Sequence, residues 1–186
     1  AGATVTVRAG EPPTIPDLPT VVEGVTTSDS CMGSVNWAEP LISDNCGEFA
    51  LETSHQSGDS FNLGITTVTY TATDLQGNTE SASFEVHIAD VHGPEISGLP
   101  LEISSDTDPD SCLAIVDWAE ASVLDHCGDF NLEKTHEPGT AFPVGTTEVV
   151  YTATDLAGNV TQVSFPVTVT DVQAPLITLI PEDQTI

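Results

Sequence analysis

The stretch VTYTATDLQGN at residues 68–78 returns almost unchanged as VVYTATDLAGN at residues 149–159. Within it, Val68, Tyr70 and Ala72 alternate with threonines, so one face is apolar and the other polar, which is the period of a half-buried β-strand. The Asp-Leu-Gln-Gly-Asn segment at its end is rich in turn-forming residues, and its glycine supplies the positive φ of a tight hairpin. The stretch therefore predicts a strand that ends in a hairpin turn, twice in one chain.

A second alternating stretch follows each turn. Its inward-facing positions are expected to be Ala82, Phe84, Val86 and Ile88 in the first copy and Val163, Phe165, Val167 and Val169 in the second. Glycine and proline interrupt the rest of the chain at short intervals, and no amphipathic helix of useful length is evident. Short strands joined by regular turns predict an all-β fold, a two-sheet sandwich with roughly seven strands per copy.

The whole chain follows this duplication without a gap at an offset of 81 residues: Trp37-Ala38-Glu39, for example, returns as Trp118-Ala119-Glu120. A period of this length is typical of a tandem array of one structural unit. We expect the 186 residues to be part of a longer exported chain, with stacked repeats and restricted hinge motion because the linkers are short. The expected segments are the tail of a preceding repeat at residues 1–9, whole repeats at residues 10–91 and 92–172, and the start of a following repeat at residues 173–186.

Acidic residues dominate the charge of the chain. It holds 29 Asp and Glu against two basic residues, Arg8 and Lys134, for a net charge of −27. Such a field repels nucleic acids and anionic lipids, so neither nucleic-acid binding nor a role at a membrane surface is expected. No apolar run approaches the ~20 residues of a membrane span, so this fragment is not expected to insert. The acids either are simply solvated or supply oxygen ligands to cations.

Each repeat carries two cysteines 15 residues apart, Cys31 and Cys46 in the first and Cys112 and Cys127 in the second. An even count at duplicated positions in an exported chain indicates one disulfide per repeat. Closing a loop of this size stabilises a fold by ~3 kcal/mol in the chain-entropy model. A zinc site is the alternative, but it needs closely spaced cysteines or nearby histidines, and only His126 adjoins a cysteine.

Aspartates that recur in both copies suggest a calcium site. The turn that contains Asp74 or Asp155 precedes the last strand of its repeat, so it lies at the end opposite the one where the chain leaves. In an end-to-end array, the Asp155 turn then faces the junction that carries Asp90. The Asp125 loop reaches the same end if the first two strands pair as a hairpin. Converging carboxylates repel one another unless a cation binds, and Ca²⁺ takes about 6–8 oxygen ligands with loose geometry.

The predicted ligands at this junction are Asp90, Asp125, Asp155 and Asn159, and Asp44 and Asp74 are their equivalents in the first repeat. Residue 9, the counterpart of Asp90, is alanine, so weaker binding is expected at the first junction. The alternative is that the turn aspartates only hold their own turns, through hydrogen bonds to the turn backbone.

No nucleophile elbow, phosphate-binding glycine loop or His-Glu-x-x-His motif occurs, so the sequence does not predict an enzyme. Trp37 and Trp118 are expected in the core, against a disulfide, rather than as sugar-binding platforms. Asn159-Val160-Thr161 has the pattern of a glycosylation acceptor, but its counterpart in the first repeat does not. The turn explains the asparagine more simply.

The chain resembles the hyalin repeat family. The motifs that carry the resemblance are Cys31, Trp37, Pro40 and Asp44-Asn45-Cys46-Gly47, the run from Phe61 to Asn78, Phe84, and in the second copy Phe142-Pro143-Val144-Gly145-Thr146-Thr147. The resemblance covers nearly the whole chain and implies immunoglobulin-like β-sandwich domains, used in extracellular adhesion and in long surface arrays. Many family members have a further cysteine where this chain has Ser83 or Ser164. The resemblance therefore implies the simple pairing of Cys31 with Cys46 and of Cys112 with Cys127.

We therefore expect a spacer and adhesion module of a long secreted or cell-surface protein, stiffened by calcium at the repeat junction. Its expected partners are neighbouring repeats of the same chain and a cell-surface protein or glycan that the sequence does not identify. The alternative is a carbohydrate-binding accessory module of a secreted enzyme. That module needs exposed aromatic side chains, whereas aromatic residues make up only 5% of this chain and nearly all fall at predicted core positions.

Overall fold

The computed structural model describes residues 10–176, and within this range the chain forms 14 β-strands and no helix. No helix among these residues is therefore long and apolar enough to cross a membrane. The chain divides into two compact units between His92 and Gly93. The all-β prediction is confirmed. The tail expected at residues 1–9 and most of the start expected at residues 173–186 lie outside the described residues.

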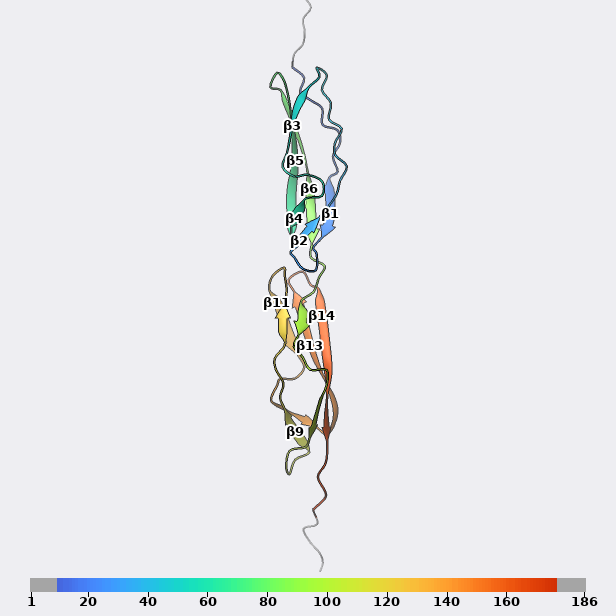
Figure 1. Cartoon of the computed structure of the whole chain (residues 1–186), viewed down its shortest axis with the longest axis vertical. Coiled ribbons are helices and arrows are strands. Elements are labelled where there is room, and N and C mark those ends of the chain that lie inside the picture. The colour runs from blue at the N-terminus through green and yellow to red at the C-terminus, as the bar shows by residue number, and fades with distance from the viewer. Residues whose placement is uncertain (1–9, 177–186) are drawn as a thin grey trace, which may run out of the picture. The chain divides into compact units, whose positions relative to one another are not determined.

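The first unit is a sandwich of a four-stranded sheet and a two-stranded sheet (Figure 1). The larger sheet has the order β1-β6-β5-β3, and the smaller pairs β2 with β4. The bounds are β1 (Val21–Val25), β2 (Met32–Ser34), β3 (Phe49–Thr53), β4 (Ser60–Asn62), β5 (Gly64–Asp74) and β6 (Thr79–Ala89).

The second unit repeats this plan, with the sheet order β11-β13-β14-β8 and the pairs β12-β9 and β10-β7. The pair β10-β7 has its counterpart in the first unit as the isolated bridge between Thr14 and Ser43. The bounds are β7 (Glu95–Ser97), β8 (Ile103–Asp106), β9 (Leu113–Val116), β10 (Ser122–Leu124), β11 (Phe130–Lys134), β12 (Thr140–Pro143), β13 (Gly145–Asp155) and β14 (Val160–Thr170).

The longest strands of each unit form the hairpin that the quoted stretch predicts. In the first unit β5 and β6 pair in register from Gly64 opposite Ile88 to Thr73 opposite Thr79. The apolar residues of these strands face inward with period two, as expected. Those that are buried are Val68, Tyr70, Ala72, Phe84, Val86 and Ile88, and their counterparts are Val149, Tyr151, Ala153, Phe165, Val167 and Val169.

A partly buried tryptophan packs against each core, and it contacts aromatic rings rather than the expected disulfide. The Trp37 ring lies 6.0 Å from Phe61 and 5.2 Å from Phe84, centroid to centroid. Its Nε1 donates a 2.8 Å hydrogen bond to Tyr70 Oη, which in turn donates to Glu39 Oε2 at 2.5 Å. Burial and the Glu39 carboxylate both raise the pKa of Tyr70, so its hydroxyl stays protonated and able to donate.

Each unit has two ends, which its longest strands define. We call the end with the turn after β5 or β13 the hairpin end, and the end where β6 or β14 finishes the exit end. The chain enters both units at the hairpin end. In the first, Asn45 Nδ2 donates a 3.1 Å hydrogen bond to Glu11 Oε2, close to the start of β3. In the second, Gly93 lies so close to the start of β14 that a Cβ there would come within 2.8 Å of Thr161 Oγ1.

Core packing predicts a matched pair of substitutions. Phe142 is 0% exposed against Trp118, so Phe142→Ala is expected to lower the free energy of unfolding by about 3–5 kcal/mol. Leu101 is 93% exposed, so Leu101→Ala is expected to change it by less than about 0.5 kcal/mol. Urea unfolding followed by circular dichroism measures both, and equal losses would contradict the assigned core.

Candidate functional site

The hairpin end of each unit is built around a turn aspartate. Asp74 Oδ1 accepts hydrogen bonds of 2.8 Å from the backbone N–H groups of Gln76 and Asn78, and its Oδ2 accepts one of 2.6 Å from Asn78 Nδ2. In the second unit Asp155 accepts bonds of 2.7 Å and 2.8 Å from the backbone and side chain of Asn159. These bonds hold the turn between the two longest strands.

Both turn carboxylates are ionised more easily than an ordinary aspartate. The side chain of Asn78 and the turn N–H groups lower the pKa of Asp74. For Asp155, partial burial opposes ionisation, but the hydrogen bonds from Asn159 and the turn backbone outweigh it and lower the pKa. The turn therefore uses most of the acceptor capacity of these aspartates, which supports the alternative that they hold their own turns.

A second aspartate loop lies at the same end. Phe49 pairs with Asp74 and Phe130 with Asp155, so the loops just before β3 and β11 lie beside the turns. Each loop is closed by a bond from a cysteine N–H to an aspartate Oδ1, 2.8 Å for Cys46 to Asp44 and 2.7 Å for Cys127 to Asp125.

Asp44 shows one feature that points to a missing partner. Its Oδ2 is buried and has no hydrogen-bond partner among the described residues. A buried carboxylate oxygen normally has a partner, because leaving one unpaired in a low-dielectric site is costly. A cation would satisfy it, and a carboxylate oxygen is the type of ligand that Ca²⁺ prefers. In the first unit, the unpartnered Oδ2 of Asp44 is thus the observation that fits the predicted set of calcium ligands.

The exit end of the first unit holds Asp90. Its Oδ1 accepts hydrogen bonds of 3.1 Å from Thr26 Oγ1 and from the backbone N–H of His92. His92 Nε2 also lies 3.1 Å from the Thr26 carbonyl oxygen. These contacts hold the chain against the end of β1 as it leaves the unit.

The second unit fastens its exit with a different side chain. Gln173 Nε2 donates to Thr107 Oγ1 at 3.2 Å and to the Asp108 carbonyl at 2.6 Å, and its backbone N–H donates to Asp171 Oδ1 at 2.9 Å. Sequence reasoning did not identify this clamp. The sequence held one clue, because threonine recurs at the equivalent positions 26 and 107. In the structure both threonines are buried polar residues.

The predicted metal ligands divide between the two kinds of end. Asp44 and Asp74 share the hairpin end of the first unit, Asp125, Asp155 and Asn159 share that of the second, and Asp90 lies at an exit end. Within either unit taken alone, no three ligand atoms from the described His, Cys, Asp and Glu residues lie within 4.8 Å of one another. A single repeat therefore does not supply a complete Ca²⁺ shell from these side chains.

The expected disulfide pairings are wrong. Cys31 and Cys127 are disulfide-bonded, whereas the thiols of Cys46 and Cys112 are free and exposed. Within a unit the two cysteines lie at opposite ends: the carbonyl of Cys31 accepts a bond from Leu63 N–H, next to the first residue of β5, while the Cys46 loop lies beside the last. The second unit has the same arrangement, because Cys112 adjoins Leu113, which pairs with Pro143, and the Cys127 loop lies beside Asp155.

The length of β5 shows why the pairing fails. Its 11 residues rise about 3.3 Å each, so its ends are about 33 Å apart. A disulfide needs Cα atoms about 4.4–6.8 Å apart. The fifteen-residue spacing suggested a local loop, but that loop runs the length of the sandwich.

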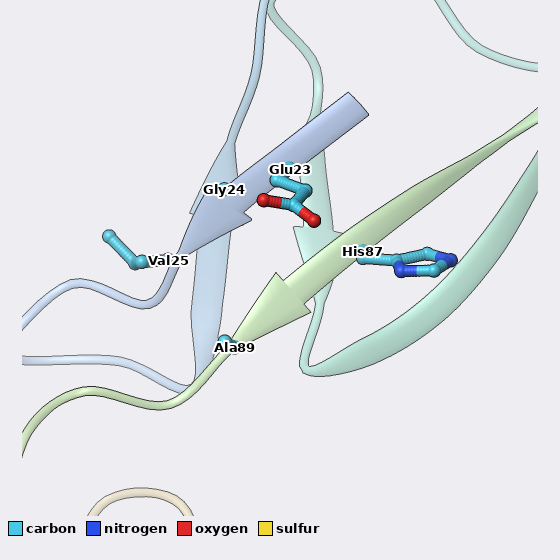
Figure 2. Close-up of a pocket in the computed structure, with 5 residues that line it drawn as sticks. All are labelled: Glu23, Gly24, Val25, His87 and Ala89. Atoms are coloured by element: carbon cyan, nitrogen blue, oxygen red, sulfur yellow. The ribbon is translucent and has the colours of Figure 1, made fainter. Parts of the chain in front are cut away.

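A shallow hollow lies on the first unit, along β1 and β6. It has a volume of about 400 Å³ and is lined by Glu23, Gly24, Val25, His87 and Ala89. Figure 2 shows Glu23 and His87 on the two paired strands, at facing register positions. His87 is paired with Glu85, its Nε2 2.8 Å from Glu85 Oε2. The second unit has Ser and Thr where the first has Glu23 and His87, so these two side chains are not a repeated feature of the array.

These features define a class of protein: a tandem array of small β-sandwich repeats with an acidic hairpin end and a fastened exit end. The HYR domain profile matches residues 10–88 and 89–169. The chain therefore belongs to the HYR domain family, and the resemblance to hyalin repeats is confirmed.

Two relatives agree with this family assignment. Hyalin of Strongylocentrotus purpuratus is 34% identical over 190 residues, covering 96% of this chain and 16% of that protein. Hyalin of Lytechinus variegatus is 33% identical over 178 residues, covering 91% of this chain and 34% of that protein. The chain thus spans a minor part of the relatives it matches. Drosophila N-cadherin EC1-3 has a TM-score of 0.31 and 14% identity, covering 87% of this chain and 68% of that one.

The turn aspartates predict an acid dependence of stability. Their pKa values are lower in the folded chain than the ordinary 3.8, so their stabilising effect is complete above that pH and is lost as the pH falls through the folded pKa. Asp74→Ala with Asp155→Ala is expected to lower the melting temperature by several degrees at pH 7 and by less at pH 2. Leu75→Ala, in the same turn but 75% exposed, is the control for melting curves across this range. A loss that is equal at both pH values would contradict the assigned hydrogen bonds.

Proposed function

We propose that the chain is a tension-bearing spacer and adhesion segment of an extracellular or cell-surface protein, and that it acts without catalysis. Its partners would be neighbouring repeats of the same protein and a cell-surface protein or glycan. The observation that carries the proposal is the topology of the repeat. The chain enters at the hairpin end, leaves at the exit end, and pairs β1 in parallel with β6 and β8 in parallel with β14.

Parallel pairing of these strands suits a chain under tension. Force on the ends of a unit pulls β1 toward the hairpin end and β6 toward the exit end, along the strands. The hydrogen bonds between them are spread over five register pairs, from Val21 with Glu85 to Val25 with Ala89. Such bonds are loaded in shear and must yield together rather than one after another. This geometry supports a mechanical role.

Chemistry and charge support an extracellular setting. Disulfide-bonded cysteines persist in oxidising compartments such as the cell exterior. The net charge of −27 keeps such chains soluble and apart from anionic surfaces. The aromatic side chains Trp37, Phe61, Tyr70 and Phe84 pack in the core, so they are not available as a sugar-binding platform. These points favour a spacer over a carbohydrate-binding accessory module.

We further propose that calcium binds where one repeat follows another, with ligands drawn from both. Asp90 would contribute from the exit end, and Asp125, Asp155 and Asn159 from the hairpin end of the following repeat. The linker is short enough for this: Glu95 comes five positions after Asp90, and Glu95 pairs with Leu124 beside Asp125. A chain of five residues spans at most about 18 Å. The unpartnered Oδ2 of Asp44 supports the same role for the equivalent loop of the first repeat.

The mechanical role predicts a difference between two neighbouring proline substitutions. Thr26 N–H donates to the Ala89 carbonyl, and parallel pairing alternates, so the N–H of Val22 faces β6 and that of Val21 does not. Val22→Pro is expected to move one of the two unfolding peaks in single-molecule pulling to lower force. The Val21→Pro variant is the matched control, and its unfolding forces should not change. The unfolding force of the unaltered second repeat should not change either. Equal forces for both variants would argue against the shear geometry.

The calcium role predicts binding and stabilisation. Calorimetric titration of Ca²⁺ should show uptake, and Ca²⁺ at about 100 times its Kd should add about 2.7 kcal/mol to the free energy of unfolding. Asp90→Asn and Asp125→Asn are expected to weaken uptake. Glu52→Gln, on the exposed middle of β3, should not. No heat of binding, together with unchanged melting in chelator, would refute the calcium proposal. Specific retention on a polysaccharide would favour the accessory-module alternative.

A further inference from the structure

We propose that Cys46 and Cys112 are cross-linking sites through which this chain forms disulfides with repeats outside the two described here. In this scheme the exit-end cysteine of one repeat, the position of Cys112, bonds to the hairpin-end cysteine of the next, the position of Cys46. The proposal shares with the proposed function only the assumption of a tandem array. It concerns the covalent continuity of that array rather than adhesion or calcium.

Neither free cysteine has a cysteine within reach inside its own repeat. Cys46 lies beside the turn that follows β5, and Cys31 lies beside the start of the same strand. The ends of this strand are about 33 Å apart, several times the Cα separation of a disulfide. The second repeat places Cys112 and Cys127 in the same opposed positions.

The two repeats differ in which of their equivalent cysteines is bonded. Cys46 and Cys127 are equivalent positions, and so are Cys31 and Cys112. Cys127 and Cys31 are disulfide-bonded, while Cys46 and Cys112 are free. Both kinds of position are therefore competent to form a disulfide in this fold. The free cysteines are Cys46, at the hairpin end of the first repeat, and Cys112, at the exit end of the second.

Both free thiols lie beside a point where the chain enters or leaves its repeat. Cys46 is exposed, and its neighbour Asn45 is hydrogen-bonded to Glu11, where the chain enters the first repeat. Cys112 is exposed, and Asp110, two residues before it, donates its backbone N–H to Gln173 Oε1, where the chain leaves the second repeat. A repeat added before or after these two therefore arrives next to a free thiol.

The bond itself requires an oxidant. The two thiols lose two protons and two electrons as one S–S bond forms, and a disulfide-bearing oxidant takes them up by thiol–disulfide exchange. In the test below that oxidant is oxidised glutathione, which is reduced to two molecules of glutathione. Local loop geometry is already set at Cys46, because its backbone N–H is fixed on Asp44 Oδ1 at 2.8 Å.

The test uses the 186-residue chain itself, produced through an oxidising secretory route. Iodoacetamide labelling without reduction, followed by mass spectrometry, should modify Cys46 and Cys112 and leave Cys31 and Cys127 unmodified. In a glutathione redox buffer, wild-type chains should then form a ladder of disulfide-linked oligomers on non-reducing gels. Cys46→Ser alone and Cys112→Ser alone should each remain monomeric. An equimolar mixture of the two variants should form a dimer and nothing longer, because each chain then has one thiol.

The mapped peptides decide the outcome. A Cys46 peptide linked to a Cys112 peptide in the mixed dimer supports the proposal. A Cys31–Cys46 or Cys112–Cys127 peptide in the secreted chain overturns it. Single variants that dimerise as readily as the mixture also overturn it, because that result means unspecific thiol oxidation. So does a wild-type chain that stays monomeric. None of these readouts depends on pulling force or Ca²⁺, so the proposed function stands or fails separately.

Discussion

The constraint on which the rest of each repeat depends is the unbroken pairing of two eleven-residue strands. These strands are β5 and β6 in the first repeat and β13 and β14 in the second, and they run the full length of their sandwich. A turn joins each pair, and an aspartate side chain accepts hydrogen bonds from the backbone of that turn. Because the pairing is antiparallel and continuous, the turn and the exit of the chain lie at opposite ends. The cysteines and the predicted ligand aspartates are then assigned to one end or the other by their register against these strands.

The interior of the sandwich supports this constraint with a short relay of hydrogen bonds. Trp37 donates to Tyr70, and Tyr70 donates to Glu39, so the polar atoms of two large side chains are satisfied where their rings fill the core. The second repeat keeps the tryptophan–tyrosine bond at 2.9 Å and adds Lys134, whose Nζ lies 2.6 Å from Glu120. Glu120 and Glu137 both raise the pKa of the Lys134 amine. The only lysine among the described residues therefore helps to hold Glu120 in this hydrogen-bond relay.

Much of the fold could be predicted from the sequence because its signals are local. The alternation around Tyr70 and Phe84, and the Asp-to-Asn turn between them, depend on neighbouring residues and need no knowledge of distant pairings. The parallel pairing of Val22 with Val86 could not be read in this way, since nothing near either residue specifies a partner some sixty positions away. The contacts that fasten the chain at the exit end could not be predicted for a related reason. His92 and Gln173 occupy equivalent positions and both contact a backbone carbonyl, but they are different residue types, so the two repeats show no shared sequence motif there.

The cysteines show how the same reasoning fails at the site. A spacing of fifteen residues reads as a small loop only if the chain turns back on itself between Cys31 and Cys46. Here it instead travels from the exit end to the hairpin end, by way of Val35, Trp37 and the bridge at Ser43. The turn aspartates were placed correctly because the hairpin is local, and the cysteines were not because their separation is set by the length of β5. Each repeat carries its cysteines and acidic loops at its ends, and most of its aromatic rings pack between them. The positions of the acidic loops and of the thiols thus have the same structural cause, the length of the central hairpin.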